Sequence, residues 1–295
     1  MRKLIHKSDL VKVIGKDNVF TRALASVAMG VLGVNKINRL YSPSAHLSDY
    51  PFTEHMLGVY GITYDKNETE MNVIPKEGPF IIVSNHPFGA IEGIILYDAI
   101  ARVRPDFKVL ANFILSYIPN LKNVFIPVNP FTDKPEWGSS IGGIKEAMAH
   151  ISKGCGLGVF PAGEVSRYNG NKYPEDIDWS VTIAKLAKKA KVPVIPFYFD
   201  GTNSKTFYRL AKMHSMLGTA MLLRELYNKR NQHFTIKIGK PILPSDFEVY
   251  DDFKKMSAYM RARSYALEAN IHNEETKRFD TKLEPLPPPR KSNML

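Results

Sequence analysis

The residues best suited to chemistry in this 295-residue sequence are a histidine and a glutamate within one short segment, SNHPFGAIEG, at residues 84–93. His86 follows an apolar run, and Pro87 and Gly89 interrupt regular structure before Glu92. A neutral imidazole accepts a proton from a hydroxyl while a carboxylate holds its other ring nitrogen. The pair therefore has the base and the orienter of a Ser-His-Asp triad without the serine, so the nucleophile would be a hydroxyl of the substrate.

Other interpretations of these residues stay open on the sequence alone. His86 also fits an ordinary surface loop, with Glu92 placed favourably at the positive N-terminus of the next helix. A zinc site is a poor fit because no further His, Cys or Asp is clustered with the pair, so no metal ligand is predicted. Cys155 is a poor nucleophile because no histidine stands beside it, and its neighbouring glycines lack the strand–turn–helix context of a dinucleotide-binding loop.

The elements that must position this pair alternate between short apolar strands and helices. Strands are predicted within GPFIIVSNHP (78–87), FKVLANF (107–113), NVFIPV (123–128), GLGVFPAGE (156–164), VPVIPFYFDG (192–201) and HFTIKIGKPI (233–242). Helices are predicted within IEGIILYDAIARV (91–103), SSIGGIKEAMAHISKG (139–154) and WSVTIAKLAKKAK (179–191). This alternation indicates an α/β fold, in which helices flank a mixed, mostly parallel sheet.

Sites in open α/β sheets gather in the loops beyond the carboxyl ends of the strands. Three loops here share that position, and they are residues 84–93, FPAGEVSR (160–167) and IPFYFDGTNS (195–204). The first carries the histidine and the glutamate. The sequence therefore places the candidate site among these three loops.

Three regions are predicted along the chain. Residues 1–60 form an N-terminal helical segment, 61–270 a catalytic domain, and 271–295 a polar, proline-rich tail that is disordered or loosely attached. In the first region, Asp17 or Asn18 is expected to cap an apolar helix that is too short to span a membrane. That helix either lies in a membrane interface or packs on the domain as a helical cap.

Charge indicates the kind of partner. The net charge of +11 suits nucleic acid, anionic lipid or an acidic carrier protein. Nucleic acid is disfavoured because no basic stripe with interleaved aromatic residues is present. The stretch AKLAKKAK (184–191) offers four lysines to an anionic partner, or it is simply a solvated face. A single cysteine and the absence of a secretory apolar segment fit a cytoplasmic protein. The basic charge would place it peripherally on the anionic inner face of the cytoplasmic membrane.

Three motifs carry a resemblance to a known family. NHPFGAIEG, FPAGEVSR and VPVIPFYFDGTNS occur in the order and spacing of the lysophospholipid (glycerolipid) acyltransferase superfamily. They most resemble its bacterial branch often labelled hemolysin-like, which includes acyltransferases making glycine lipids and ornithine lipids. ANFILSYIPNLKNVFIPVNPF and YMRARSYAL are also similar to that branch. The likeness covers roughly residues 20–270.

The resemblance implies an activity and a site. His86 would take the proton from an acceptor hydroxyl that attacks the thioester of acyl-ACP or acyl-CoA, and Glu92 would orient the histidine. The acyl donor is a co-substrate, and no cofactor is implied. The residues assigned to substrate binding are Asn85, Phe88, Gly89, Phe160, Pro161, Gly163, Glu164, Ser166 and Arg167. A backbone N–H within Phe88–Ala90 is expected to stabilise the thioester oxyanion.

The sequence departs from the superfamily pattern at informative positions. Five residues rather than four separate the histidine from the acid, and the acid is Glu instead of Asp. In the third motif, usually Phe-Pro-Glu-Gly-Thr-Arg-Ser, the threonine and arginine that serve a phosphate-bearing acceptor are replaced by Glu164 and Val165. Asn112 and Val128 stand where further cations are expected. Several groups that would grip a phosphate are therefore missing.

These departures favour a lyso-aminolipid over an acceptor built on glycerol phosphate. The best-fitting acceptor is N-(3-hydroxyacyl)glycine, and the alternatives are a lyso-ornithine lipid and a lysophospholipid such as 1-acylglycerol-3-phosphate. Arg167 remains as a cation for a headgroup carboxylate, unless it only forms a local salt bridge with Glu164. The expected partners are an acidic acyl carrier protein and a lipid acceptor in an anionic membrane surface. A rival of another class is a non-catalytic, hemolysin-like protein that binds membranes.

Overall fold

The computed structural model describes residues 2–14, 16–65, 67–112, 115, 118–128, 140–272 and 278–279. Its α-helices are α1 (Lys7–Ile14), α2 (Val19–Val31), α3 (Val34–Tyr41), α4 (Asp49–Tyr60), α5 (Glu68–Met71), α6 (Ile91–Ala101), α7 (Ser140–Ser152), α8 (Val181–Ala190), α9 (Lys205–Met213), α10 (Ser215–Asn228), α11 (Pro244–Glu248) and α12 (Phe253–Tyr265). Short 3-10 helices are η1 (Ser42–Ser44), η3 (Pro119–Leu121) and η5 (Ala266–Asn270). The strands are β1 (Thr63–Tyr64), β2 (Phe80–Ser84), β3 (Lys108–Asn112), β4 (Phe125–Val128), β5 (Gly156–Val159), β6 (Val194–Phe199), β7 (His233–Phe234) and β8 (Ile236–Ile238).

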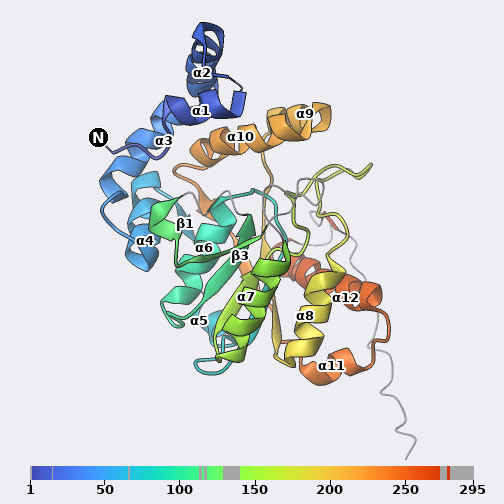
Figure 1. Cartoon of the computed structure of the whole chain (residues 1–295). Helices are drawn as coiled ribbons and strands as arrows, with labels where there is room; N and C mark the ends of the chain where they lie inside the picture. The colour runs from blue at the N-terminus through green and yellow to red at the C-terminus, as the bar shows by residue number, and fades with distance from the viewer. Residues whose placement is uncertain are drawn as a thin grey trace, which may run out of the picture.

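The centre of the molecule is a six-stranded sheet in the order β4-β3-β5-β2-β6-β8. Every pairing in it is parallel except that of β8 with β6, which is antiparallel. Strand β2 lies inside the sheet, between β5 and β6, and all five of its residues are buried. The fold class predicted from the sequence, a mixed and mostly parallel sheet flanked by helices, is confirmed (Figure 1).

Side chains of β2 alternate between two hydrophobic cores, as the period of a strand requires. Phe80 and Ile82 point into a core that contains residues of α4 and α6. Ile81 and Val83 point into the opposite core, against α7, α8 and α12. Helix α6 is buried at every position, so its second residue, Glu92, is carried into the interior. The two cores therefore fix the end of β2 and the start of α6, the two places that hold the candidate pair.

Most predicted elements occur in the structure, with one clear exception. The run HFTIKIGKPI is predicted to form a single strand, but it forms two. Strand β7 pairs with β1 in a separate two-stranded parallel sheet, whereas β8 joins the main sheet beside β6. The Asp65 carboxylate accepts the backbone N–H of Ile236 at the break, at 3.2 Å. The helices α9, α10, α11 and α12 have no counterpart among the helices predicted from the sequence.

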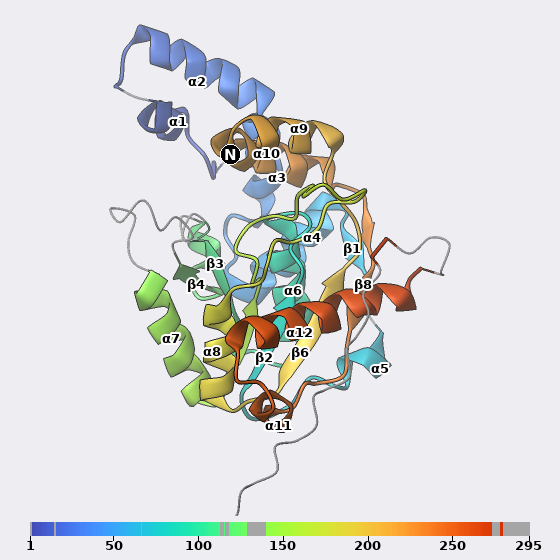
Figure 2. The same ribbon diagram turned by 90° about the vertical axis from the view of Figure 1, so that its right-hand side faces the viewer.

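The N-terminal region is helical as predicted, and Asn18 rather than Asp17 caps α2. The Asn18 Oδ1 atom accepts the backbone N–H of Thr21 at 2.9 Å, and Asp17 instead pairs with Arg22. Helices α1, α2 and α3 lie at the same end of the molecule as α9 and α10, and α2 stands away from the sheet (Figure 2). Within the parts of the chain that the structure describes, no helix is both long enough and apolar enough to cross a membrane.

The described residues of the C-terminal region are attached to the domain rather than free. The guanidinium Nε of Arg278 lies 3.0 Å from the buried carboxylate of Glu268, and the Arg278 side chain also contacts Asp200. The ring of Phe279 packs edge-on against Tyr265, with centroids 4.9 Å apart. The prediction of a disordered or loosely attached tail is therefore wrong for these two residues. The rest of that prediction, apart from residues 271–272, lies outside the described residues.

Candidate active site

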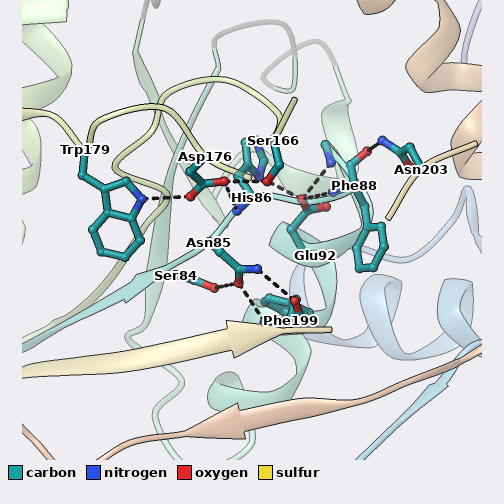
Figure 3. Close-up of polar contacts among 11 residues, drawn as sticks. Ser84, Asn85, His86, Phe88, Glu92, Ser166, Asp176, Trp179, Phe199 and Asn203 are labelled. Carbon is teal, nitrogen blue, oxygen red and sulfur yellow. Dashed lines mark hydrogen bonds and ion pairs between the residues drawn. The ribbon is translucent and has the colours of Figure 1, made fainter. Parts of the chain in front are cut away.

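The structure brings His86 and Glu92 into contact (Figure 3). The Nδ1 atom of His86 lies 2.9 Å from the Oε1 atom of Glu92. This distance makes the two groups an ion pair when the imidazole is protonated. The carboxylate is fully buried, whereas 16% of the imidazole is exposed. Because Nδ1 faces the carboxylate, the ring nitrogen that can meet a substrate hydroxyl is Nε2.

The turn between the two residues holds the carboxylate in place. Glu92 Oε1 accepts the backbone N–H groups of Phe88 and Gly89, at 2.8 and 2.7 Å. The longer side chain of glutamate thus reaches back across the extra residue of this motif. The N–H groups of Phe88 and Gly89 are among those expected to stabilise an oxyanion, and for these two residues that expectation is wrong. Their hydrogen atoms point at Glu92, because a buried carboxylate must be compensated by donors.

The electrostatics of the pair follow from burial and from neighbouring charge. Burial lowers the pKa of His86, but the adjacent carboxylates of Glu92 and Asp176 outweigh it, so the pKa lies above its ordinary value. Burial raises the pKa of Glu92, but His86 and the Gly89 N–H lower it further, and the net pKa lies below its usual range. The glutamate is therefore a carboxylate at neutral pH, and the histidine becomes a better-populated base as the pH rises.

A second carboxylate, Asp176, holds the backbone of the histidine. Its Oδ1 atom accepts the backbone N–H of His86 at 3.1 Å and the hydroxyl of Ser166 at 2.6 Å. Its Oδ2 atom accepts the indole N–H of Trp179 at 2.8 Å. Burial raises the pKa of Asp176, although the three donors oppose this shift. Asp176 is not predicted from the sequence, because EDIDW offers three acids in five residues and nothing marks which one points inward.

Two residues predicted to bind substrate are instead committed to internal hydrogen bonds. The backbone N–H of Ser166 donates to the His86 carbonyl at 2.8 Å, so Ser166 uses both its N–H and its hydroxyl to hold the site together. Asn85 exchanges two hydrogen bonds with the backbone of Phe199, at 2.9 and 2.8 Å, and joins the ends of β2 and β6. Both are buried, at 3% exposure. In the structure, these groups of Ser166 and Asn85 connect the loops and strand ends around His86.

The loop after β5 lies beside the imidazole, as its position in the sheet predicts. The ring of Phe160 stacks on the ring of His86, with centroids 4.6 Å apart and an angle of 27° between the planes. The carbonyl of Pro161 accepts the N–H of Ser180, the residue that caps α8. Gly163 is exposed and has a positive φ of 71°, which favours glycine. Phe160 thus contacts the base directly, whereas Pro161 secures the loop.

A single arginine borders this loop, and it is paired. The Arg167 guanidinium lies 2.8 Å from the Glu164 carboxylate, and both side chains are about half exposed, at 53% and 42%. Asn112 and Val128, which occupy positions where the superfamily pattern leads one to expect cations, are the last residues of β3 and β4. Ser166, the neighbour of Arg167, is bonded to His86. The arginine therefore follows a residue bonded to the His86 backbone, and its half-exposed guanidinium is accessible to a ligand that can compete with Glu164.

The turn residues Phe88 and Gly89 are tightly enclosed. Phe88 is buried at 4% exposure, and its ring packs edge-on against Phe234. Gly89 has a φ of 110°, and a Cβ atom there would lie 2.7 Å from a methyl group of Leu222 on α10. Neither residue offers a free side chain to a substrate. Their function in the structure is to place the two N–H groups that bind Glu92.

Comparison with known proteins agrees with this geometry. A family model described as acyltransferase matches residues 21–274. A lyso-glycine lipid O-acyltransferase of Bacteroides thetaiotaomicron is 30% identical over 201 residues, which cover 66% of this chain and 72% of that protein. A protein of the same name from Phocaeicola vulgatus is 30% identical over 177 residues, covering 57% and 61%.

A solved structure is also similar. It is the crystal structure of the 1-acyl-sn-glycerophosphate acyltransferase of Thermotoga maritima, with a TM-score of 0.47 and 18% identity, covering 76% of this chain and 78% of that one. The family resemblance predicted from the three motifs is confirmed by the family model and the two relatives. The family model extends from the start of α2 beyond η5, and it includes every residue described above around His86, so this chain belongs to the acyltransferase family.

Proposed function

We propose that this protein transfers a fatty acyl chain from acyl-ACP or acyl-CoA to the hydroxyl of a lyso-glycine lipid, N-(3-hydroxyacyl)glycine. The observation that carries the chemistry is the contact between His86 Nδ1 and the buried carboxylate of Glu92, at 2.9 Å. It leaves Nε2 of a carboxylate-backed imidazole at the carboxyl end of β2. The acyl donor is a co-substrate, and no metal or bound cofactor takes part.

The reaction runs through one addition and one elimination. His86 Nε2 removes the proton of the acceptor hydroxyl as its oxygen attacks the thioester carbonyl carbon. The resulting tetrahedral intermediate expels the thiolate when the carbon–sulfur bond breaks, and the imidazolium returns the proton to that sulfur. The products are the ester and the free thiol of the carrier. Glu92 stabilises the imidazolium formed between the two proton transfers, because it keeps its negative charge throughout.

The acceptor is inferred from the relatives and from the cations near the pair. Two relatives carry the name lyso-glycine lipid O-acyltransferase. Arg167 is a half-exposed cation in the loop after β5, which borders His86, and Glu164 already offsets one of its contacts. One arginine matches the single carboxylate of a glycine headgroup, whereas a phosphate monoester with about two charges is better served by several cations. Asn112 and Val128 supply none.

The acceptor is expected to reach the site from an anionic membrane surface, on which the protein lies from the cytoplasmic side. Large apolar residues of α2 are exposed, among them Val19 at 85%, Phe20 at 75% and Val27 at 60%. Helix α9, at the same end of the molecule, carries three cations and no acid. An apolar face beside a cationic helix fits the interface of an anionic bilayer.

An apolar cluster lies between this surface and the loop beside His86. Leu32, directly after α2, packs against a cluster formed by Phe207, Tyr208 and Met221. Val165, in the loop beside the imidazole, packs against the same cluster. We therefore expect a lipid chain that enters beside α2 to lie against this cluster on its way to the loop that borders His86.

The acyl donor is expected to be carried by an acidic carrier protein that docks on the basic face of α8. Lys185, Lys189 and Lys191 are exposed, whereas Lys188 donates to the Tyr250 carbonyl at 2.6 Å and is partly buried. Three exposed lysines on one helix suit a partner of opposite charge. Their replacement by glutamate should raise KM for acyl-ACP far more than KM for acyl-CoA.

The function is tested with purified wild-type protein and two variants, His86→Ala and the exposed-site control His46→Ala. Each receives acyl-ACP or acyl-CoA with N-(3-hydroxyacyl)glycine, the ornithine analogue or 1-acylglycerol-3-phosphate, and diacyl products are measured by mass spectrometry. Product from the glycine acceptor that disappears in His86→Ala and persists in His46→Ala supports the proposal. If product forms mainly from 1-acylglycerol-3-phosphate, the protein is still an acyltransferase, but the proposed glycine-lipid acceptor is refuted. Equal product from wild type and His86→Ala refutes the role of the histidine.

The membrane surface is tested by sedimentation with vesicles. Wild-type protein should sediment with vesicles containing phosphatidylglycerol, and the double variant Phe20→Glu, Val27→Glu should remain in solution. The matched control is Val103→Glu, another exposed apolar residue, which follows α6. Loss of sedimentation in the control as well, or its retention in the double variant, would show that α2 is not the contact.

A further inference from the structure

The loop after β6 supplies no group to the proposed chemistry, yet its polar groups are buried beside the catalytic turn. Asn203 is only 6% exposed. Its Nδ2 atom donates to the carbonyl of Phe88 at 3.0 Å (Figure 3), and its backbone N–H donates to the hydroxyl of Tyr208 at 3.1 Å. The N–H of Phe88 binds Glu92. Asn203 therefore binds the carbonyl of Phe88, while the N–H of the same residue binds the Glu92 carboxylate.

A buried acid on α10 fixes this loop in turn. Glu225 is 2% exposed and accepts the backbone N–H of Ser204 at 3.0 Å and its hydroxyl at 2.6 Å. The same hydroxyl accepts the N–H of Phe207 and caps α9. Because Ser204 is bonded through both its backbone and its side chain, the adjacent Asn203 has little freedom to move.

A buried lysine completes the arrangement. The Nζ atom of Lys229 donates to the carbonyl of Thr202 at 2.8 Å and lies 4.5 Å from the centroid of the Phe88 ring. A buried ammonium group is costly unless negative charge is near it. Burial lowers the pKa of Lys229, and the carboxylates of Glu225 and Glu92 oppose that shift. Lys229 thus lies on the α10 side of the Phe88 turn, within the influence of two carboxylates.

The two carboxylate oxygens of Glu92 differ in their surroundings, and this difference suggests how Lys229 could act. Oε1 takes the contacts from His86 and from the turn, whereas Oε2 is buried and accepts no hydrogen bond from the residues that the structure describes. A buried carboxylate keeps its charge only where positive charge or donors replace lost hydration. His86 supplies positive charge only while it is protonated. The ammonium form of Lys229 would supply it independently of the protonation state of His86.

We propose that Asn203 and Lys229 are positioning residues of the acyl transfer. Asn203 fixes the Phe88 turn and so the place of Glu92, and Lys229 keeps Glu92 ionised when His86 is the neutral base. This inference rests on the proposed role of His86 as that base. The first residue acts through geometry and the second through charge, and substitutions separate the two effects.

The test is the pKa of the His86 imidazole, measured by NMR in protein with labelled histidine. The chain has eight histidines, and the signal that disappears in His86→Ala identifies the right one. Lys229→Met removes a positive charge, so the pKa of His86 should rise by roughly half a unit or more. Asn203→Ala loosens the turn and weakens the contact with Glu92, so the pKa of His86 should fall. Besides the two partners themselves, the titratable groups that face the pair are Asp176, which acts on His86, and Tyr208 and Lys229, which act on Glu92; Glu225 in turn faces Tyr208 and Lys229.

Opposite shifts are the signature, because simple loss of packing would weaken the contact with Glu92 in both variants and lower both values. Lys229→Arg restores the charge and should bring the pKa back toward that of the wild type. The matched control is Arg224→Met, which removes an exposed cation from α10, the helix that Lys229 directly follows, and should leave the pKa unchanged. Lys229→Gln keeps a donor for Thr202 and replaces Lys229→Met if the latter does not fold.

Activity gives a second readout. In Asn203→Ala, kcat should fall about 10- to 100-fold with little change in KM, because the base is misplaced while the substrate surface is intact. Shifts in the same direction in both variants, or no shift in either, would overturn the proposal. The titration needs no substrate, so it judges this arrangement even if the protein transfers acyl chains to none of the acceptors offered. That last result would refute the proposed function instead.

Discussion

The hydroxyl of Ser166 lies 2.6 Å from Asp176 Oδ1, the same oxygen that accepts the backbone N–H of His86. Loops that follow two different strands of the sheet are thus tied through one buried carboxylate. Ser166→Ala should lower the free energy of unfolding by about 1.5–3 kcal/mol, because a hydrogen bond to a buried charged group is lost. Ser152→Ala, at an exposed hydroxyl on α7, should change it by less than about 0.5 kcal/mol. Urea denaturation measures both, and equal effects would contradict the role of Ser166.

The charge of Glu92 should control both the rate and its pH dependence. Glu92→Gln keeps the shape but removes the negative charge that raises the pKa of His86. The acid limb of the kcat profile should therefore move to lower pH, while kcat falls by about 100-fold or more because the imidazolium loses its partner. Glu92→Asp keeps the charge but shortens the reach, so kcat should fall with a smaller move of the limb. If the acid limb of the kcat profile of Glu92→Gln stayed at the wild-type pH, the charge of Glu92 would not control the pKa of His86.

Protonation of His86 should also stabilise the fold within a defined pH window. Its pKa is above the ordinary value in the folded protein, so the folded state binds the proton more tightly than the unfolded chain. This stabilisation is complete below about pH 6.5, the unfolded value, and it is lost as the pH rises through the folded pKa. The difference in unfolding free energy between wild type and His86→Gln should therefore shrink from acid to alkaline pH. Urea denaturation between about pH 5.5 and pH 9 measures it, and a difference that grows with pH would contradict the assignment.

Gly89 should tolerate no side chain. Gly89→Ala places a Cβ atom at a φ of 110° and 2.7 Å from a methyl group of Leu222, so it combines backbone strain with a clash. Gly170→Ala is the matched control, because Gly170 also has a positive φ, of 85°, but a Cβ atom there would have no neighbour among the described residues within 4 Å. Each should lose about 1–3 kcal/mol through strain, and Gly89→Ala should lose more and should also lower kcat. Equal losses, measured by thermal and urea denaturation, would show that Leu222 moves away at little cost.

The parts of this molecule that the sequence predicts are those with a strong local signal. Ile81, Ile82 and Val83 mark β2 because a buried parallel strand is a continuous apolar run. Helix α12 escapes prediction because FKKMSAYMRARSY mixes polar and apolar residues and buries only part of its surface. The run that contains β7 and β8 has the pattern of one strand, since only the pairing with β1 and β6 divides it.

The residues of the candidate site also differ in whether a local sequence signal predicts them. His86 and Glu92 are found from the sequence because the turn between them brings them together locally. Asp176 and Asn203 are not, because their roles depend on pairings with residues 90 and 115 positions away. Motif position alone assigns Ser166 and Asn85 to the substrate. Only their hydrogen bonds to the protein reveal that they serve the scaffold.

The contact between His86 and Glu92 spans six positions of the chain, whereas the bonds that hold it span about a hundred. In folding terms, the pair belongs to a local segment of low contact order, and its supports are long-range contacts that close late. A nascent chain ending after α6 already contains both reacting partners, but not Ser166, Asp176, Asn203 or Lys229. Activity is therefore expected to appear only after α10 has been synthesised and docked. We thus expect the order in which the chain is synthesised to delay acyl transfer until the domain around the His86–Glu92 pair is complete.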